Sequence, residues 1–501
     1  MAQLAERPFG PGSYPLVIVG SGPGGLQLSY CLRRLGVRHA VLSADDAPGG
    51  MFRRWPHFQR LISWTKPFGS APRRSRVFER YDWNSLLADD DAGAGLTREF
   101  MDGTSAFPSR PEMQRGLEAF AERTGIEVRY GCRWEATRRA GDGFVLVSSD
   151  GEYRSPLLVF AIGVADPYRP PVPGLEAVPH YAEVKPVREY AGKRVFIVGK
   201  RNSAFELAEG FLPVARQIVL ASPRPAKLAI NTLSVSDVRA RYLTPYEDHR
   251  MRGGVSVVDA VIEAVTRKPS GYQVRTRPSD GAAELSFEVD EVIVATGFVA
   301  PVRDLPELGV ATAGPNRVPA QTPLWQSASV PGIYFAGTIT QGAAGLRKHG
   351  IPSSSGAVHG FRYNARILAR HLAERHFGIA LPRPTLRPEA VVPHLLAEAT
   401  RAPELWLQRS YLSRVVCLDP ASGITDEGIL PLQHFVEGGG ADGVAVAIEM
   451  NPQGETYPAV YVRRGGRVAE HLLPQNGLLD FETPEHQRAL AAALEGLLPR
   501  S

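Results

Sequence analysis

Cysteine is scarce in this chain of 501 residues: there are three cysteines, and no two of them form a Cys-x-x-Cys pair. This excludes a dithiol centre within one motif and fits a reducing compartment. No apolar run approaches the roughly 18 residues that a membrane span needs, and the first 13 residues hold no apolar leader. We therefore expect a cytoplasmic protein with no membrane partner.

Several other functional patterns are missing as well. The net charge of +5 comes without basic blocks, which argues against a nucleic-acid partner. The sequence has no metal-ligand spacing, no Ser-His-Asp order and no P-loop, so we expect no metal site. At this length, with 44% hydrophobic residues, the chain can form about two to four domains with a large core.

A glycine-rich stretch near the N-terminus carries the first positive signal. The apolar run 15–19 leads into Gly20, Gly22, Pro23, Gly24 and Gly25, and an apolar face at helical spacing follows (Leu28, Cys31, Leu32, Leu35). We expect Cys31 to lie in the core with that face. A strand, a glycine loop and a helix in this order place backbone N–H groups and a helix N-terminus against a pyrophosphate. The stretch therefore predicts a dinucleotide site.

The acidic residue that usually contacts a ribose hydroxyl is absent from the end of the second strand, residues 39–42. Ser43 stands there, and Asp45 and Asp46 follow. Ser43 could accept a weaker hydrogen bond, or Asp45 could reach back to the ribose. In the alternative, both aspartates belong to a solvated turn.

A second apolar run, 195–198, leads into another such loop, formed by Gly199, Lys200, Arg201, Asn202 and Ser203. Arg201 replaces the glycine that lets the backbone approach the pyrophosphate, so it either crowds the phosphate or binds it. Ser222 and Arg224 follow the next strand where no acid stands, which suits a 2′-phosphate and favours NADPH over NADH. The alternative is that Arg224 is a surface residue.

Five segments within residues 14–375 resemble the flavin-dependent monooxygenase superfamily, which includes the flavin-containing, N-hydroxylating and Baeyer–Villiger enzymes. They are the first glycine loop, the stretch 49–67, the Phe-Pro-Ser-Arg sequence 107–110, His180 with Tyr190, Gly192 and Lys193, and Asp290 with 295–298. In this superfamily the stretch that resembles 49–67 lies along the flavin. The resemblance implies FAD and NADPH as cofactors, and a small-molecule substrate with dioxygen as partners; a homo-oligomer stays open.

The resemblance also implies site residues. Those expected at FAD are Gly20, Gly22, Pro23, Gly25, Ser43, Asp45, Gly50, Met51, Phe52, Trp55, Arg60, Gly163, Gly337, Thr338 and Ser355. Those expected at NADPH or at the crossing to its domain are Gly199, Lys200, Arg201, Asn202, Ser203, Ser222, Arg224, Thr296 and Gly297. Thr65 and Lys66 are the candidate catalytic residues, because a donor beside the flavin could stabilise a flavin peroxide. In the alternative, Lys66 is an ordinary solvated lysine.

The sequence departs from the superfamily at three places. The Phe-x-Gly before the signature histidine is missing, Tyr181 follows His180 in place of serine, and Arg201 is closer to pyridine nucleotide-disulfide reductases. One group of those reductases carries a single active cysteine in the first glycine loop. Gly24 stands at that position here, so such chemistry lacks its nucleophile.

We expect an α/β fold with two Rossmann-like domains and a small C-terminal α+β domain. The expected bounds are 1–165 and 297–385 for the FAD domain, 166–296 for the NADPH domain and 386–501 for the C-terminal domain. Within the last, 395–412 has helical character, 444–448, 459–462 and 468–473 are predicted strands, and 485–498 is a predicted helix. This domain could cap the substrate pocket, form a dimer or bind a partner.

The expected function is an NADPH-dependent monooxygenase that transfers oxygen from a C4a-peroxyflavin to a small organic substrate. N-hydroxylation of an amine is favoured by the segment 290–298, and sulfoxidation or Baeyer–Villiger insertion stays open. One alternative is an NADPH-dependent flavin reductase that passes electrons to a separate acceptor. A second is a non-catalytic flavoprotein in which Arg201 blocks NADPH and the C-terminal domain binds a partner.

Overall fold

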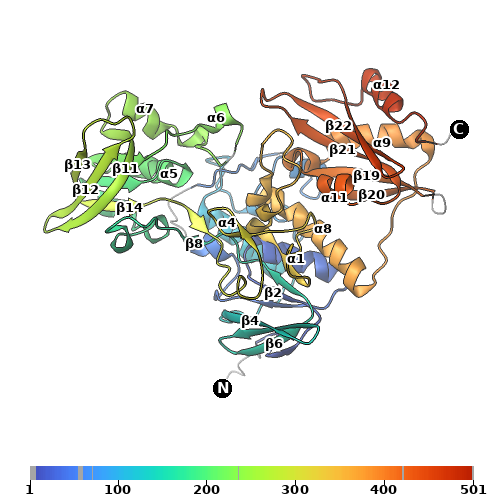
Figure 1. The fold of residues 1–501 in the computed structure, drawn as a ribbon, viewed down its shortest axis with the longest axis horizontal. Coiled ribbons are helices and arrows are strands. Elements are labelled where there is room, and N and C mark those ends of the chain that lie inside the picture. The colour runs from blue at the N-terminus through green and yellow to red at the C-terminus, as the bar shows by residue number, and fades with distance from the viewer. Residues whose placement is uncertain (1–6, 55–59, 70–71, 235, 420–422, 499–501) are drawn as a thin grey trace.

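The computed structural model describes residues 7–54, 60–69, 72–234, 236–419 and 423–498 (Figure 1). It contains two sheets whose central strands run parallel and a separate antiparallel sheet at the C-terminal end, each with helices packed on it. The predicted α/β fold with a C-terminal α+β part is confirmed. In Figure 1 the second parallel sheet and the C-terminal sheet stand on either side of the segments that form the first.

The first parallel sheet has the order β18-β7-β2-β3. Its strands are short and fully buried: β2 (Val17–Val19), β3 (Ala40–Leu42), β7 (Leu158–Phe160) and β18 (Ile333–Phe335). An antiparallel sheet beside it is formed by β4 (Trp134–Ala140), β5 (Gly143–Ser148) and β6 (Gly151–Ser155), with β1 (Gly12–Ser13) paired parallel to β6. Helices α2 (Arg76–Glu79), α3 (Leu96–Glu99) and α4 (Arg110–Arg123) lie between β3 and β4 in the chain.

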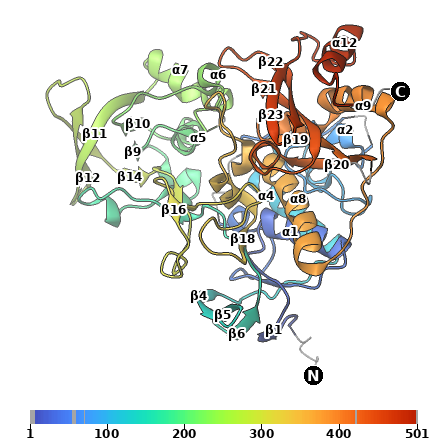
Figure 2. The same ribbon diagram turned by 45° about the vertical axis from the view of Figure 1, so that its right-hand side comes forward.

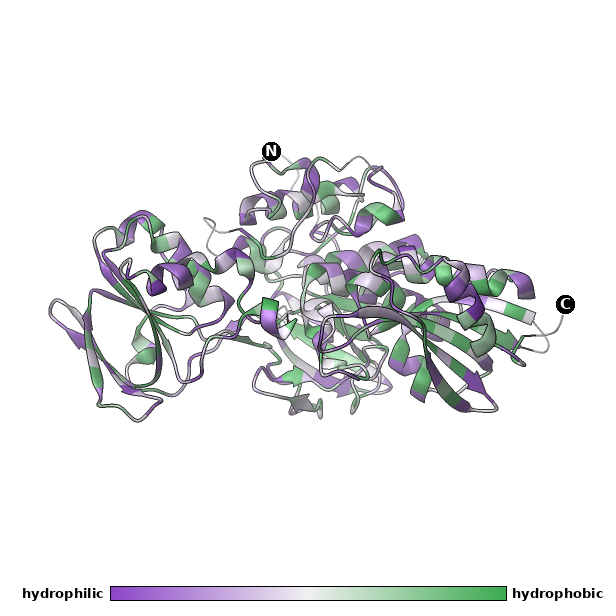
Figure 3. Cartoon of the chain, turned by 90° about the horizontal axis from the view of Figure 1, so that it is seen from above, coloured by the Kyte–Doolittle hydropathy of each residue, from purple (hydrophilic) through white to green (hydrophobic). Residues whose placement is uncertain are grey.

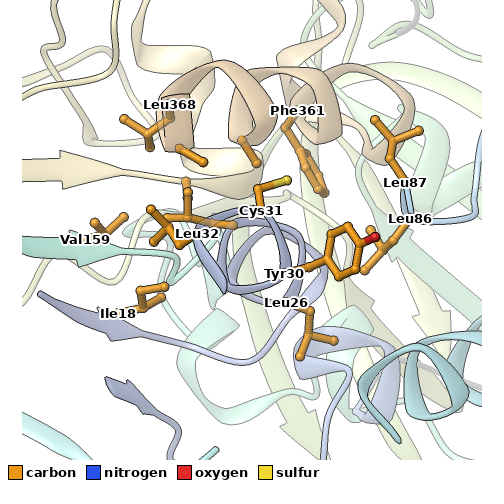
Figure 4. Packing of buried hydrophobic residues seen from close by; sticks show 14 of the residues in the cluster. Ile18, Leu26, Tyr30, Cys31, Leu32, Leu86, Leu87, Val159, Phe361 and Leu368 are labelled. Carbon is orange, nitrogen blue, oxygen red and sulfur yellow. The ribbon is translucent and has the colours of Figure 1, made fainter. Parts of the chain in front are cut away.

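Helix α1 (Pro23–Arg34) lies between this sheet and helix α8 (Val358–Phe377). Figure 4 shows Cys31 and Leu32 of α1 facing Phe361 and Leu368 of α8. Cys31 is 8% exposed, so its predicted place in the core is confirmed. Each fully buried side chain of this size contributes about 1.5–3 kcal/mol to folding. This packing fixes the N-terminal ends of both helices at the same edge of the sheet.

The second sheet has the order β13-β12-β11-β10-β9-β14, and the strands from β11 to β14 in this order run parallel. Its strands are β9 (Arg194–Val198), β10 (Gln217–Ser222), β11 (Val255–Lys268), β12 (Gly271–Pro278), β13 (Leu285–Val289) and β14 (Glu291–Val294). The helices on it are α5 (Asn202–Phe211), α6 (Ala229–Thr232) and α7 (Thr244–Arg250).

Two chain segments connect the parallel sheets, and they lie side by side. Strand β8 (Asp166–Pro167) leaves the first sheet and pairs antiparallel with β15 (Phe298–Val299), which returns to it. The return then passes through β16 (Thr312–Ala313) and β17 (Val318–Pro319) before β18. The second sheet is thus inserted between β7 and β18 of the first.

The C-terminal sheet is entirely antiparallel, in the order β20-β19-β21-β22-β23. Its strands are β19 (Leu412–Asp419), β20 (Gly423–Pro431), β21 (Asp442–Met450), β22 (Thr456–Arg464) and β23 (Arg467–Leu472). Its helices are α9 (Pro388–Arg401), α10 (Pro403–Leu407), α11 (Leu432–Glu437) and α12 (Pro484–Ala493). Thr385 bridges to Thr425 at its edge.

One expectation for this region was wrong at its C-terminal end. The predicted helical stretch 395–412 ends at Leu407, and the strand β19 begins at Leu412. Val415 packs in one core cluster and Val416 in another, on opposite faces of β19. Strands β19 and β20 were not predicted from the sequence. A strand buried on both faces, such as β19, lacks the apolar–polar alternation that marks a half-buried strand. The expected strands 444–448, 459–462 and 468–473 correspond to β21, β22 and β23.

Helices throughout the molecule carry both hydrophilic and hydrophobic residues (Figure 3). Among the residues that the structure describes, we find no helix whose length and apolar character would let it span a bilayer.

Candidate functional site

The first glycine loop joins the end of β2 to the start of α1. A Cβ atom at Gly24 would lie 2.2 Å from the Cα of Gly337, and one at Gly25 would lie 2.0 Å from the carbonyl oxygen of Gly20. Only glycine permits such close backbone approach. A Cβ at Gly22 would have its nearest neighbour at 4.0 Å, on Gly50. The loop is therefore tightly packed on one side and open at Gly22, as a pyrophosphate-binding loop requires.

The open side of this loop faces a cavity of about 460 Å³, within the usual size of cofactor and ligand pockets. The cavity lies at the carboxyl ends of β2, β3, β7 and β18, where α/β sheets bind their ligands. The predicted FAD residues that line it are Gly20, Gly22, Pro23, Ser43, Asp45, Gly50, Met51, Phe52, Gly163, Gly337 and Thr338. The fold thus brings these predicted residues together in one place, and the cavity that they line fits FAD.

At one end of the cavity, Ser43 and Asp45 stand after β3. The Ser43 hydroxyl is 3% exposed and accepts hydrogen bonds from Ser21 Oγ at 2.8 Å and from the backbone N–H of Asp45 at 3.2 Å. Its own hydrogen stays available to a ligand. The Asp45 carboxylate forms an ion pair with Arg54, and both residues line the cavity. The end therefore offers the serine donor and the aspartate acceptor that a ribose would use.

The other end, which we call the flavin end, is lined by Leu61, Ile62, Ser63, Asn84 and the start of α8 at 356–358. Asn84 is 0% exposed. Its Nδ2 donates to the carbonyl oxygen of Ser63 at 3.1 Å and to Thr65 Oγ1 at 3.0 Å, and its Oδ1 accepts from Ser63 Oγ. Asn84 was not predicted from the sequence, because it follows a loop 18 residues beyond Lys66 and belongs to no recognisable motif.

Thr65 and Lys66 lie behind this wall and are not among the described residues that line the cavity. Thr65 is 0% exposed and donates to Asp82 Oδ1 at 2.8 Å. Lys66 is exposed, with its Nζ 4.3 Å from the centre of the Tyr81 ring. Thr65 therefore positions Asn84, and Lys66 makes a cation–π contact at the surface. A catalytic role for either stays a prediction.

Arg60 and Trp55 are the remaining predicted contacts from this stretch. Arg60 donates to the carbonyl oxygen of Phe107 at 3.0 Å and to Thr104 Oγ1 at 3.0 Å. Its guanidinium therefore joins its own segment to residues 104–107. Trp55 lies outside the described residues.

Ser355 stands at the entrance of α8, behind the flavin end, and is 0% exposed. Its hydroxyl accepts hydrogen bonds from Asn364 Nδ2 at 3.0 Å and from Gln408 Nε2 at 3.1 Å. Gln408 also donates to Asn364 Oδ1 at 2.8 Å. Gln408 belongs to the segment between α10 and β19, so the C-terminal part of the chain supports the helix end that lines the cavity. The sequence could not indicate this contact, since 53 residues separate the partners.

The second glycine loop joins β9 to α5. Lys200 is 4% exposed and forms an ion pair with Asp259 of β11, whereas Arg201 is exposed at the N-cap of α5. Asn202 accepts from the backbone N–H of Arg239 at 2.9 Å and donates to the carbonyl oxygen of Asp237 at 2.9 Å. Lys200 and Asn202 thus bind neighbouring protein groups, which leaves Arg201 and the helix end, with Ser203 in its first turn, to face a phosphate.

Ser222 ends β10, and Arg224 follows it on the surface. The Ser222 hydroxyl donates to the carbonyl oxygen of Arg224 at 3.4 Å, and the Arg224 guanidinium is exposed with no ion pair among the described residues. The arrangement leaves a free cation beside the carboxyl end of β10, where the 2′ position of a bound nucleotide lies in this fold.

Thr296 and Gly297 lie where the chain returns toward the first sheet. Thr296 Oγ1 donates to the carbonyl oxygen of Tyr168 at 2.5 Å, and the Gly297 carbonyl accepts from His180 Nε2 at 3.0 Å. Asp290, at the other end of β14, pairs with Arg194 at 2.9 Å. These contacts hold β14 and the two crossing segments together.

Glu206 of α5 links the nucleotide-binding sheet to the flavin end. Tyr181 Oη donates to its carboxyl at 2.7 Å, and Tyr242 Oη lies 3.0 Å from it. Burial raises the pKa of Glu206 to about 7, although the two tyrosine hydroxyls oppose the shift. Tyr242 Oη also donates to the carbonyl oxygen of Arg60 at 2.7 Å. Tyr242 therefore connects the Glu206 carboxyl to a contact between the two parallel-sheet domains.

None of the three cysteines is set up as a nucleophile. Burial raises the pKa of the Cys31, Cys132 and Cys417 thiols to about 11, so each is protonated at neutral pH. Cys132 lines the cavity near Ser43 and Trp134, away from the flavin end, and its Sγ lies 3.0 Å from Asp150 Oδ1.

The chain is similar to several proteins of known kind. It is 28% identical over 435 residues to the mouse FAD-dependent oxidoreductase domain-containing protein 2, and the match covers 80% of this chain but 64% of the mouse protein. The chain thus spans less than two thirds of that relative.

Among solved structures, the Bacillus cereus bacillithiol disulfide reductase has a TM-score of 0.57 at 19% identity, covering 73% of this chain and 100% of the other. The flavin-containing monooxygenase from Stenotrophomonas maltophilia has a TM-score of 0.53 at 22% identity, with 72% and 98% covered. At these identities the likeness shows the fold alone.

The family described as pyridine nucleotide-disulphide oxidoreductase matches residues 17–337, more than half of the chain. With the two dinucleotide-binding sheets, this confirms the predicted resemblance to two-domain flavoprotein oxidoreductases that use FAD and NADPH. The chain belongs to the pyridine nucleotide-disulphide oxidoreductase family.

Proposed function

We propose that this chain is an FAD-containing, NADPH-dependent monooxygenase that transfers one oxygen atom from dioxygen to a small organic substrate. Bound FAD supplies the hydride acceptor and the site of dioxygen activation. The observation that carries the proposal is the flavin end of the cavity. Leu61 and Ile62 give it an apolar wall, Asn84 gives it a fixed amide, and among the described residues no thiol lines it.

The chemistry of the cysteines argues against a disulphide reductase. Attack on a disulphide requires a thiolate within reach of the flavin, and all three thiols are held protonated. The first glycine loop places Pro23 and Gly24 at the cavity, where a single-cysteine reductase would need its nucleophile.

The chain's own groups have definable tasks at the flavin end. Leu61 and Ile62 exclude water, which strengthens every electrostatic interaction inside the cavity. Ser63 and Asn84 hold each other in one orientation, so their dipoles need no rearrangement during reaction. The start of α8, at 356–358, lines this wall, so the positive end of the helix dipole lies beside it.

An amine nitrogen is our favoured target, because residues 290–298 resemble the corresponding segment of N-hydroxylases. In this chain Asp290 and Thr296 hold the crossing segments together, so they do not themselves select a substrate. Thioethers and ketones therefore belong in the same test.

The test is a panel of amines, thioethers and ketones incubated with the FAD-loaded protein, NADPH and dioxygen. Product is scored by the mass of one added oxygen, because NADPH loss alone also reports uncoupled turnover. We expect an oxygenated product. Oxidation of NADPH that reduces an added electron acceptor and oxygenates no compound would instead establish a reductase.

A variant links the product to the flavin end. Asn84→Ala should lower oxygenated product per NADPH consumed roughly a hundredfold, as loss of a preorganised polar group does in other enzymes. Asn316→Ala, an exposed residue between β16 and β17, is the matched control and should leave this ratio unchanged. Equal ratios in both variants would remove Asn84 from the proposal.

A further inference from the structure

A second cavity, of about 360 Å³, lies where the C-terminal sheet meets α2 and α8, and we call it the interdomain cavity. Figure 2 shows α2 and α8 next to β19 and β20 of that sheet. No described residue lines both this cavity and the one that fits FAD. The charged residues that line it are four arginines and two carboxylates: Arg76, Arg366, Arg370, Arg414, Glu404 and Asp426.

Two of the four arginines are held in the wall by carboxylates of the C-terminal part. Arg76 donates to Glu398 at 2.7 and 2.8 Å and to Glu404 at 2.9 Å. Arg414 donates to Asp426 at 2.8 Å and to Glu398 at 3.1 Å. Both carboxylates that line the cavity are therefore already paired with Arg76 or Arg414.

The other two arginines, Arg366 and Arg370, stand one turn apart on α8. Side chains four residues apart share a helix face, and two like charges there repel each other. The Arg366 guanidinium lies 3.9 Å from Glu404 and 4.0 Å from Asp89, which is too far for a hydrogen bond. Burial opposes its charged form, but Glu79 and Glu404 hold the pKa of Arg366 above its ordinary value, so it stays a cation.

Arg370 is the least neutralised of the four. Its Nη1 lies 3.6 Å from the place of a Cβ at Gly428 of β20, which also lines the cavity. Among the described residues, Arg370 has no hydrogen bond and no ion pair. Burial lowers its pKa, although Glu374 and Glu427 oppose the shift, and both of these carboxylates pair with Arg383. A guanidinium that is partly removed from water is stabilised by a bound anion.

Apolar side chains line the same cavity beside these arginines. Ile367, the chain neighbour of Arg366, is 5% exposed, and Ile429 of β20 and Pro384 are further members of the wall. The cavity is within the usual size of small-molecule sites. It therefore offers two cations without hydrogen-bond partners next to an apolar surface, which suits a small organic molecule that carries an anionic group.

We propose that the interdomain cavity binds a small organic phosphate monoester, with its phosphate on Arg366 and Arg370 and its organic part against Ile367 and Ile429. A phosphate monoester carries about −1.5 to −2 charges near pH 7 and three acceptor oxygens, which match two guanidiniums. The bound ligand neutralises Arg370 and joins α8 to β20. The site is separate from the cofactor cavity, so this inference does not depend on the proposed monooxygenase function.

The test measures binding of phenyl phosphate to the FAD-loaded protein saturated with NADP⁺, so that both dinucleotide sites are occupied. Calorimetry and the melting temperature are followed in a phosphate-free buffer at constant ionic strength. We expect one site per chain, a dissociation constant below about 1 mM and a melting temperature that rises with ligand concentration. If no saturable binding occurs up to about 10 mM, the proposal is overturned.

Two related anions test the class of ligand. Inorganic phosphate should bind about tenfold more weakly than phenyl phosphate, because it has no apolar part to bury. Phenylacetate should also bind at least about tenfold more weakly, since a carboxylate has fewer charges and acceptor oxygens. Inorganic phosphate that binds as tightly as phenyl phosphate would contradict a monoester, and phenylacetate that does so would contradict a phosphate.

Variants locate the site. Arg370→Gln and Arg366→Gln should each weaken phenyl phosphate binding about tenfold, and Arg370→Lys should fall in between. Without ligand, Arg370→Gln should not lower the melting temperature, because no described partner is lost. Arg387→Gln, whose side chain is 83% exposed at the start of α9, is the control. Phenyl phosphate affinities of the Arg366 and Arg370 variants equal to that of Arg387→Gln would refute the assignment.

Discussion

Gln408 donates a hydrogen bond of 3.1 Å to the hydroxyl of Ser355, and through it the C-terminal part of the chain contacts the helix end behind the flavin site. Both side chains are 0% exposed. A buried hydrogen bond of this kind resists loss, since breaking it leaves buried polar groups unpaired. The C-terminal sheet is thus tied to the cofactor cavity through buried contacts.

Replacing Gln408 should therefore affect the flavin site from a distance. Gln408→Ala should lower the free energy of unfolding by about 1–3 kcal/mol and reduce the FAD retained after purification, because Ser355 and Asn364 both lose a partner. Urea unfolding and the flavin-to-protein absorbance ratio measure these effects. Gln433→Ala is the control, because this partly exposed glutamine forms its hydrogen bond within α11. Equal FAD retention in the two variants would contradict the link.

The first glycine loop should tolerate no side chain at Gly24. In Gly24→Ala the added Cβ would lie 2.2 Å from Gly337 Cα, so two backbones must separate, at about 1–3 kcal/mol or more. We expect little FAD in the purified variant and a lower melting temperature. Gly10→Ala, where nothing lies within 4 Å, should behave as the original protein. A flavin-loaded Gly24→Ala of unchanged stability would show that this contact is not tight.

Arg224 should set the choice of nicotinamide nucleotide. In Arg224→Ala the ratio of kcat/KM for NADPH over NADH should fall about tenfold, because the 2′-phosphate loses a charge-assisted contact while NADH has none to lose. Steady-state kinetics with both nucleotides measure the ratio. Arg275→Ala, an exposed arginine on β12, should leave it unchanged. An undiminished preference would place the 2′-phosphate elsewhere.

Glu206 should make stability depend on pH. Its pKa of about 7 in the folded chain lies above the ordinary 4.5, so between these values the folded state keeps a proton that the unfolded state releases. Its contribution is complete below about pH 4.5 and is lost as the pH rises through about 7. Between about pH 5 and pH 8, the free energy of unfolding should fall less in Glu206→Gln than in the original chain. Parallel pH profiles would contradict the raised pKa.

Patterns that are local in the sequence were enough to predict the first dinucleotide site. Contacts between residues far apart in the chain could not be predicted in this way. The loop 20–25, Ser43 and Gly50–Phe52 reach the cavity because strand, glycine turn and helix follow each other in the chain. Thr65 was assigned a place at the flavin, but its register places it behind Asn84, whose position depends on a loop held by Asp82. Gln408 depends on how the segment before β19 packs, and β19 itself was not predicted from the sequence.

The most direct measurement is anaerobic mixing of the FAD-loaded chain with NADPH while the oxidised-flavin absorbance is followed. The account predicts one FAD per chain and complete bleaching by NADPH, with NADH much slower. Protein that stays colourless when supplied with FAD, or a bound flavin that NADPH does not bleach, would contradict it.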